Sequence, residues 1–328
     1  MRPTTHRYLA LSTSFVLILA VTGSAAAARP TDAGRASGTS FMGTLGGHGG
    51  DAHQDAGKPA GGKNLHSNGG AIQRAPAVYI SYWGTEWNSA TGPNATYTYA
   101  NAMTYNNDFF ANVGGSAWNG IVTQYCMGVA RGSTSCSGVS ASNFIANPTG
   151  QLQGTWVDTA AVPSSPSQTD IANAAKRLAA HFGVATPAYA NATFMVFTPS
   201  GKSMNGFAAT GGNWCAWHSS TTYNGASFAY AYIPYLPDAG ASCGMNFINA
   251  NNGYGNGYFD GFSVVAGHEY SEAETDPFPS RGWVDRQGAE NADKCAWSSK
   301  SANITLGSHA YAVQPTWSNA ISGCPTVS

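Results

Sequence analysis

The chain has 328 residues, of which only 9% are charged, against about a quarter in ordinary soluble domains. Its formal net charge is −1, and no basic stripe runs along it, which excludes the electrostatic footprint of a nucleic-acid-binding protein. Gly, Ser, Thr, Asn and aromatic residues take the place of charge. This composition suits an extracellular protein, whether or not it meets a neutral polymer such as a cell-wall glycan.

Residues 1–28 have the features of an export signal. Arg2 and Arg7 precede an apolar run from Leu9 to Val21, and a stretch of small residues ends at Ala28. The apolar run is shorter than the roughly 20 residues of a membrane span. We therefore expect cleavage after Ala28, secretion to the extracellular space, and no membrane association afterwards.

The next segment, 29–76, has almost no apolar content and is rich in Gly. Such a composition cannot bury a core, so we expect a disordered linker or pro-segment. Its histidines His48, His53 and His66 are interpreted as solvated loop residues rather than metal ligands. The remaining residues, 77–328, are expected to fold as one domain.

Apolar runs and alternating patterns predict several strands and three helices in this domain. The strands are expected over 78–83, 121–126, 193–198, 227–233 and, more weakly because Pro315 interrupts it, 310–317; the helices are expected over 97–113, 170–182 and 259–275. Ser167 and Asp170 can form a capping box for the second helix, and Pro277 closes the third. Strands and helices mix without strict alternation, which predicts an α+β fold with a mixed sheet packed on helices.

The chain contains an even number of cysteines, which in an exported protein is typical of disulfides. None of the spacings is C-x-x-C, so a zinc ribbon is not expected. Proximity in the sequence predicts the pairs Cys126–Cys136, Cys215–Cys243 and Cys295–Cys324.

The third predicted helix carries the sequence His268-Glu269-x-x-Glu272. Residues four apart share a helical face, so His268 and Glu272 can bind one cation at roughly 2.0–2.2 Å. Glu269 lies on the adjacent flank, where it can act as general base on a metal-bound water. The layout is that of the H-E-x-x-H zinc peptidases with a carboxylate in place of the second histidine.

A competing interpretation is a solvated acidic helix face. The apolar first half of the helix and its lack of Lys or Arg favour a bound cation instead, because unpaired buried acids require one. We expect Zn²⁺. Another divalent cation remains open, since an added carboxylate makes the site more suitable for harder ions.

A third protein ligand is required, and Glu290 lies 18 residues beyond Glu272. This spacing is similar to that of the glutamate-zincin peptidases, in which an acid one turn later orients the first histidine. We therefore expect Glu290 as a ligand and Asp293 as the residue that holds the imidazole, although the two roles can be exchanged. His218 is a further candidate, as a ligand, a hydrogen-bond donor to the transition state, or a packed core histidine.

The pattern H-E-x-x-E-x-x-T-D-P, followed by Trp and then E-x-x-D-x-C, resembles the exordium, or phosphate-induced, family of plant cell-wall proteins and its exported bacterial relatives. The matching residues are His268, Glu269, Glu272, Thr275, Asp276, Pro277, Trp283, Glu290, Asp293 and Cys295. The resemblance implies an extracellular location and a zincin-like core, but no established reaction. The chain departs from plant members in the Gly-rich segment 29–76 and at Asp276, where they commonly have Asn.

Two functions remain open at this point, with a third less supported. The first is a secreted metal-dependent hydrolase, a zinc metallopeptidase that acts on extracellular protein or peptide through Glu269 and His218. The second is a non-catalytic exordium-like protein with a structural metal, associated with the cell wall or with glycan. A glycosidase with a carboxylate pair among Glu269, Glu272 and Glu290 is the third.

Overall fold

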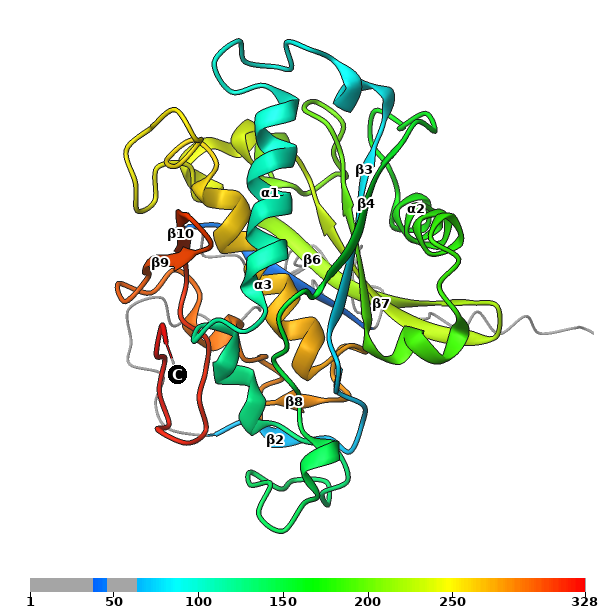
Figure 1. Ribbon diagram of the computed structural model, residues 1–328, viewed down its shortest axis with the longest axis vertical. Helices are drawn as coiled ribbons and strands as arrows, with labels where there is room; N and C mark the ends of the chain where they lie inside the picture. The colour runs from blue at the N-terminus through cyan, green and yellow to red at the C-terminus, as the bar shows by residue number, and fades with distance from the viewer. Residues whose placement is uncertain (1–37, 46–63, 328) are drawn as a thin grey trace, which may run out of the picture. The chain divides into compact units, whose positions relative to one another are not determined.

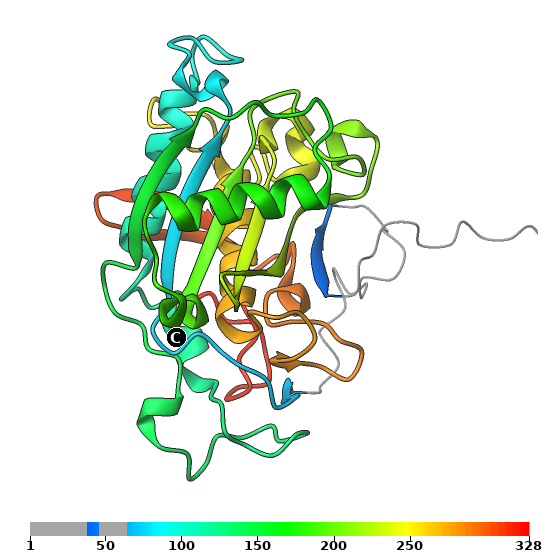
Figure 2. The same cartoon turned by 90° about the vertical axis from the view of Figure 1, so that its right-hand side faces the viewer.

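The computed structural model describes residues 38–45 and 64–327. The expected signal segment, 1–28, lies outside these residues, as do His48 and His53. Within the described part the chain is α+β, with a mixed six-stranded sheet and helices on both of its faces (Figures 1 and 2).

The strands of the sheet follow the order β1-β6-β7-β5-β3-β4. They are β1 (Thr39–Gly43), β3 (Ala77–Trp83), β4 (Leu152–Asp158), β5 (Ala192–Phe197), β6 (Trp214–Tyr223) and β7 (Ala226–Ile233). The pairs formed among β4, β3, β5 and β7 are parallel, whereas β6 and β1 add antiparallel. Asn224 and Gly225 join β6 to β7 with positive φ angles of 49° and 79°, which a tight hairpin requires.

Two helices, α1 (Tyr99–Val113) and α3 (Asp260–Thr275), cover one face of the sheet, and α2 (Gln168–His181) covers the other (Figures 1 and 2). The capping box expected from Ser167 and Asp170 is present at the start of α2. The sequence predicted all three helices, because each has a long apolar pattern and a clear stop.

Every residue of α3 is buried. Gly267 allows α3 to pack closely against α1 because it has no side chain. A Cβ at this position would lie only 3.3 Å from the rings of Phe109 and Trp118. At its start, Asp260 accepts hydrogen bonds from the backbone N–H groups of Gly257 and Asn249, at 2.9 and 2.7 Å. The polar side chains of this helix therefore point into the interior of the protein.

Smaller elements lie outside the six-stranded sheet. The strands are β2 (His66–Ser67) paired with β8 (Trp283–Val284), and β9 (Ala302–Leu306) paired with β10 (His309–Val313). Short 3-10 helices are η1 (Thr85–Asn88), η2 (Asn119–Gln124), η3 (Ala141–Asn143), η4 (Thr186–Asn191), η5 (Ala208–Thr210), η6 (Leu236–Cys243) and η7 (Asp293–Cys295).

Two strand predictions need correction. Residues 121–126 are not a strand, because most of them form η2, in which Ile121 and Val122 are both buried. A short apolar run that is buried all round carries no periodicity that separates a strand from a helical turn. The strand predicted over 310–317 ends at Val313, since Pro315 has no N–H to donate.

The expectation of disorder over 29–76 does not hold for the parts that the structure describes. Strand β1 adds to the edge strand β6, and β2 pairs with β8. Met42 and Leu65 are fully buried. A few apolar side chains are enough to order these segments, because their backbones also form hydrogen bonds with β6 and β8.

All three predicted disulfides are present: Cys126–Cys136, Cys215–Cys243 and Cys295–Cys324. Together they are compatible with an extracellular protein. Among residues 38–45 and 64–327, no helix combines the length and the apolarity needed to cross a bilayer.

Candidate metal centre

The side chains of the His268-Glu269-x-x-Glu272 motif meet residues from two other parts of the chain inside the protein. Helix α3 supplies His268, Glu269 and Glu272, and strand β6 supplies His218. The segment between β8 and β9 supplies Glu290 and Asp293. Contacts between α3 and β6 hold the first two parts together.

One group of ligand-type atoms gathers at His268. Its Nε2 lies 3.0 Å from Oε1 of Glu272 and 3.5 Å from Oδ1 of Asp293. This nitrogen is buried and makes no hydrogen bond, even though the carboxylate oxygen is so near. Close approach without hydrogen-bond geometry is the arrangement of atoms that share a cation.

Gln314 fixes which nitrogen of His268 is free to bind a cation. Its amide Nε2 donates to the carbonyl of Ala292 at 2.9 Å, so its Oε1 faces Nδ1 of His268 at 3.3 Å. Nδ1 must then carry the hydrogen, which leaves the lone pair on Nε2. Histidine ligands in proteins commonly donate their other N–H in this way. Gln314 carries no signal in the sequence, because a single glutamine after a strand belongs to no recognisable motif.

A second group gathers at His218. Its Nδ1 lies 3.2 Å from Oε2 of Glu269 and 3.4 Å from Oε2 of Glu272. On the other side of the ring, Nε2 lies 3.3 Å from the carbonyl oxygen of Asp276 and 3.6 Å from Oε1 of Glu290. The sequence had left His218 open between three roles, and its imidazole is surrounded by oxygen acceptors rather than by apolar side chains alone.

Asp293 and Glu290 therefore occupy different places. Asp293 joins His268 and Glu272, and its backbone N–H donates to Oε1 of Glu272 at 3.0 Å. Glu290 lies beyond His218, and neither of its carboxylate oxygens has a hydrogen bond. The structure thus brings Asp293 to His268 and Glu272, and Glu290 to His218.

Two other acids near the motif have separate partners. Asp276 ends α3, and its carboxylate accepts N–H bonds from Ser280, Arg281 and Gly282 at 2.6, 3.1 and 2.6 Å. Glu274 accepts a hydrogen bond at 3.1 Å from Nδ2 of Asn119. Neither carboxylate is among the ligand-type atoms gathered at His268 and His218, although the charge of Asp276 acts on His218 and Glu290.

Burial makes the charges of this cluster costly. His218, His268, Glu269 and Glu272 are 0% exposed, and Glu290 is 1% exposed. Within the described residues no Lys or Arg forms an ion pair with these acids; Lys294 pairs with Asp285 instead. Buried carboxylates without a counter-charge are strongly destabilising, so the cluster needs either protons or a cation.

The shifted pKa values of these residues also indicate that the cluster requires protons or a cation. Burial raises the pKa of Glu269 to about 7 and that of Glu290 well above its usual value. Burial alone would lower the pKa of His268 and His218, but the surrounding carboxylates outweigh it and raise both. Burial would likewise raise the pKa of Glu272, yet the two imidazoles hold it well below its usual value. Without a cation, the acids of the cluster would have to be balanced by protons on the rings.

The distances fit a metal ion. Tetrahedral ligands about 2.1 Å from an ion lie about 3.4 Å from one another. The separations at His268 are 3.0 and 3.5 Å, and those at His218 are 3.2 and 3.4 Å. All the side-chain oxygens are carboxylates, which suits Zn²⁺ and also harder divalent ions. In both groups the ligand atoms lie within 4.8 Å of one another.

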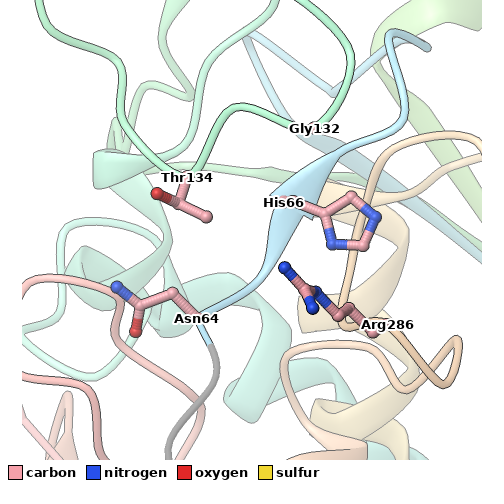
Figure 3. Close-up of a pocket in the computed structure, with 5 residues that line it drawn as sticks. All are labelled: Asn64, His66, Gly132, Thr134 and Arg286. Atoms are coloured by element: carbon pink, nitrogen blue, oxygen red, sulfur yellow. The ribbon is translucent and has the colours of Figure 1, made fainter.

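A cavity away from this cluster is lined by a positively charged side chain and by no acid. It is lined by Asn64, His66, Gly132, Thr134 and Arg286, none of which belongs to the cluster, and its volume is about 350 Å³. Figure 3 shows the ring of His66 beside the guanidinium of Arg286. A permanent positive charge at this place disfavours a cation, so the structure gives His66 no role as a metal ligand.

No family model, no curated protein and no solved structure matches this chain. The likeness to the exordium family therefore remains a prediction that rests on the motif residues alone.

Proposed function

We propose that this protein is a metal-dependent hydrolase, with a Zn²⁺ or other divalent cation held by His268, Glu272 and Asp293. One observation carries the proposal. Nε2 of His268 is buried, has no hydrogen bond, and lies beside two carboxylate oxygens at 3.0 and 3.5 Å.

The cation, when bound, would polarise a substrate carbonyl and make a water molecule more acidic. Glu269 would be the general base for this water. Its Oε2 is held by Nδ1 of His218 at 3.2 Å, while its Oε1 is buried and has no partner. A carboxylate fixed through one oxygen and free at the other is well placed for proton transfer. His218 thus positions the base through the hydrogen on Nδ1.

The proposed reaction class is peptide-bond hydrolysis, and the proposed substrate is an extracellular protein or peptide. The motif helix, packed on a mixed sheet with Glu269 next to two ligands, supports a zincin-like arrangement. The export features of the N-terminal sequence and the three disulfides support secretion.

Burial favours a second candidate function. Of the three proposed ligands, His268 and Glu272 are fully buried, and only Asp293 reaches the surface, with a side chain 20% exposed. A closed site is typical of a structural metal. On this reading the protein is non-catalytic, the ion stabilises the fold, and the partner is a cell-wall polymer or glycan.

Metal analysis and a proteolysis assay on the full chain separate these functions. For the hydrolase we expect bound metal in the wild type, cleavage of a denatured protein substrate, and loss of cleavage on chelation. Glu269→Gln should keep the ion at His268 and lose about 10²–10⁴-fold in rate, the usual contribution of a general base. Equal cleavage by wild type and variant would remove Glu269 from the mechanism.

A matched control is Glu274→Gln, the same substitution on the same helix outside the two groups. Because Glu274 receives its hydrogen bond from Asn119, an amide in its place should keep both metal and activity. A structural metal predicts a different result, in which no variant cleaves and chelation lowers the melting temperature of every one.

A further inference from the structure

We propose that the cluster binds two divalent cations rather than one, bridged by the carboxylate of Glu272. The second ion is held by Nδ1 of His218 together with Oε2 of Glu269 and Oε2 of Glu272. This inference extends the proposed function and rests on its first ion at His268.

The two oxygens of Glu272 serve different imidazoles. Oε1 lies 3.0 Å from Nε2 of His268, and Oε2 lies 3.4 Å from Nδ1 of His218. Oε2 is buried and makes no hydrogen bond, so the short distance to His218 is not explained by one. A carboxylate placed in this way joins two ions, and paired ions in hydrolytic enzymes lie about 3.5–4 Å apart.

The ring of His218 is oriented as a metal ligand would be. Nε2 lies 3.3 Å from the carbonyl oxygen of Asp276, an acceptor that calls for an N–H at this nitrogen. In a neutral ring with this tautomer, Nδ1 presents its lone pair to the carboxylates of Glu269 and Glu272, and a cation between them stabilises the arrangement. A protonated ring would instead donate from Nδ1 to Oε2 of Glu269 at 3.2 Å.

Glu290 lies on the other side of the ring. It is 1% exposed, and both of its carboxylate oxygens lack hydrogen bonds. Oε1 lies 3.6 Å from Nε2 of His218, too far for a hydrogen bond. The carbonyl oxygen of Asp276 is therefore the group that orients the ring, and the carboxylate of Glu290 lies next to it.

Five carboxylates, those of Glu269, Glu272, Asp276, Glu290 and Asp293, lie at the two imidazoles or beside them, and among the described residues no Lys or Arg pairs with them. Such a concentration of acids favours bound cations. One ion plus a proton on His218 is the alternative, since it also satisfies both ring nitrogens, and the number of bound ions decides between the two.

The general base is kept in the two-ion centre. Glu269 would bind the second ion through Oε2 only, and its partnerless Oε1 remains available to a proton. The second ion would therefore hold the base in place, a task that the hydrogen bond from His218 performs in the one-ion alternative.

The test is metal stoichiometry and magnetic coupling in the full chain. Purified protein, stripped and reloaded with Mn²⁺, should bind two ions and give the spin-coupled electron paramagnetic resonance spectrum of a bridged pair. His218→Gln should bind one ion and give an uncoupled spectrum, with circular dichroism to confirm its fold. His181→Gln, at the end of α2, is the matched control and should still bind two coupled ions.

The outcomes separate this inference from the proposed function. One ion in both wild type and His218→Gln overturns the second site and leaves the hydrolase standing. Two uncoupled ions, unaffected by His218→Gln, also overturn it, because the extra ion would then be bound elsewhere. No bound ion in the wild type overturns both proposals. If His218→Gln does not fold, the coupled spectrum of the wild type decides alone.

Discussion

Gln314 offers a sensitive test of the metal centre, because it contacts His268 but no proposed ion. Its side chain accepts from Nδ1 of His268 at 3.3 Å and donates to the carbonyl of Ala292 at 2.9 Å, and the residue is fully buried. Gln314→Leu keeps the approximate volume and removes both hydrogen bonds. The imidazole then loses the partner that fixes its tautomer.

We expect metal affinity to fall about 10–100-fold in Gln314→Leu, which corresponds to about 1.4–2.8 kcal/mol. The metal-free protein should also lose about 1–3 kcal/mol of stability, since a buried carbonyl and a buried N–H are left unpaired. Competition with a chromogenic chelator measures the first quantity, and denaturant unfolding in chelator measures the second.

The control is Gln73→Leu, another fully buried glutamine, whose side chain bonds Thr193 at 2.9 Å. It should lose stability without losing metal affinity. If both variants bind metal as tightly as the wild type, the argument that Gln314 fixes the tautomer of His268 and so leaves Nε2 free for the metal is refuted.

Three further predictions concern the scaffold. Replacing both Cys215 and Cys243 with Ser should cost about 3.6 kcal/mol, from the 28-residue separation that the disulfide closes, and denaturant unfolding with and without reductant measures it; an unchanged midpoint would contradict the entropy argument. The hydroxyl and N–H of Ser167 lower the pKa of Asp170, so Ser167→Ala should raise that pKa in an NMR titration. A carboxyl pKa that is lower in the folded than in the unfolded protein stabilises the fold above the unfolded pKa, so the variant should be less stable than wild type near pH 7. The difference should shrink as the pH falls, down to the pH-independent loss of the N-cap hydrogen bond from Asp170 N–H; a difference that does not change with pH would argue against it. Gly282→Ala should lower the melting temperature, because its Cβ would collide with a backbone carbonyl at the end of α3, and an unchanged value would show that the loop can move.

Much of the local structure could be predicted from the sequence. The stop signals and apolar patterns gave all three helices, and the capping residues at 167 and 170 behave as expected. The disulfides followed from proximity, since short loops close most easily. These features depend on residues close together in the chain.

Strand β1 and the η2 segment were mispredicted for one reason. The residues of β1 become a strand only because β6 offers an open edge, and the apolar residues of η2 are buried whatever their backbone does. Neither fact is visible in the local sequence.

The sequence by itself determined the chemistry of the candidate centre, because a helix places His268 and Glu272 on one face whatever the rest of the fold. Only the tertiary structure decided the partners. It brought Asp293 to His268, placed Glu290 behind His218, and set Gln314 against the ring. Contacts between distant segments depend on how the sheet and helices pack, and no local spacing encodes which oxygen of Glu272 faces which imidazole.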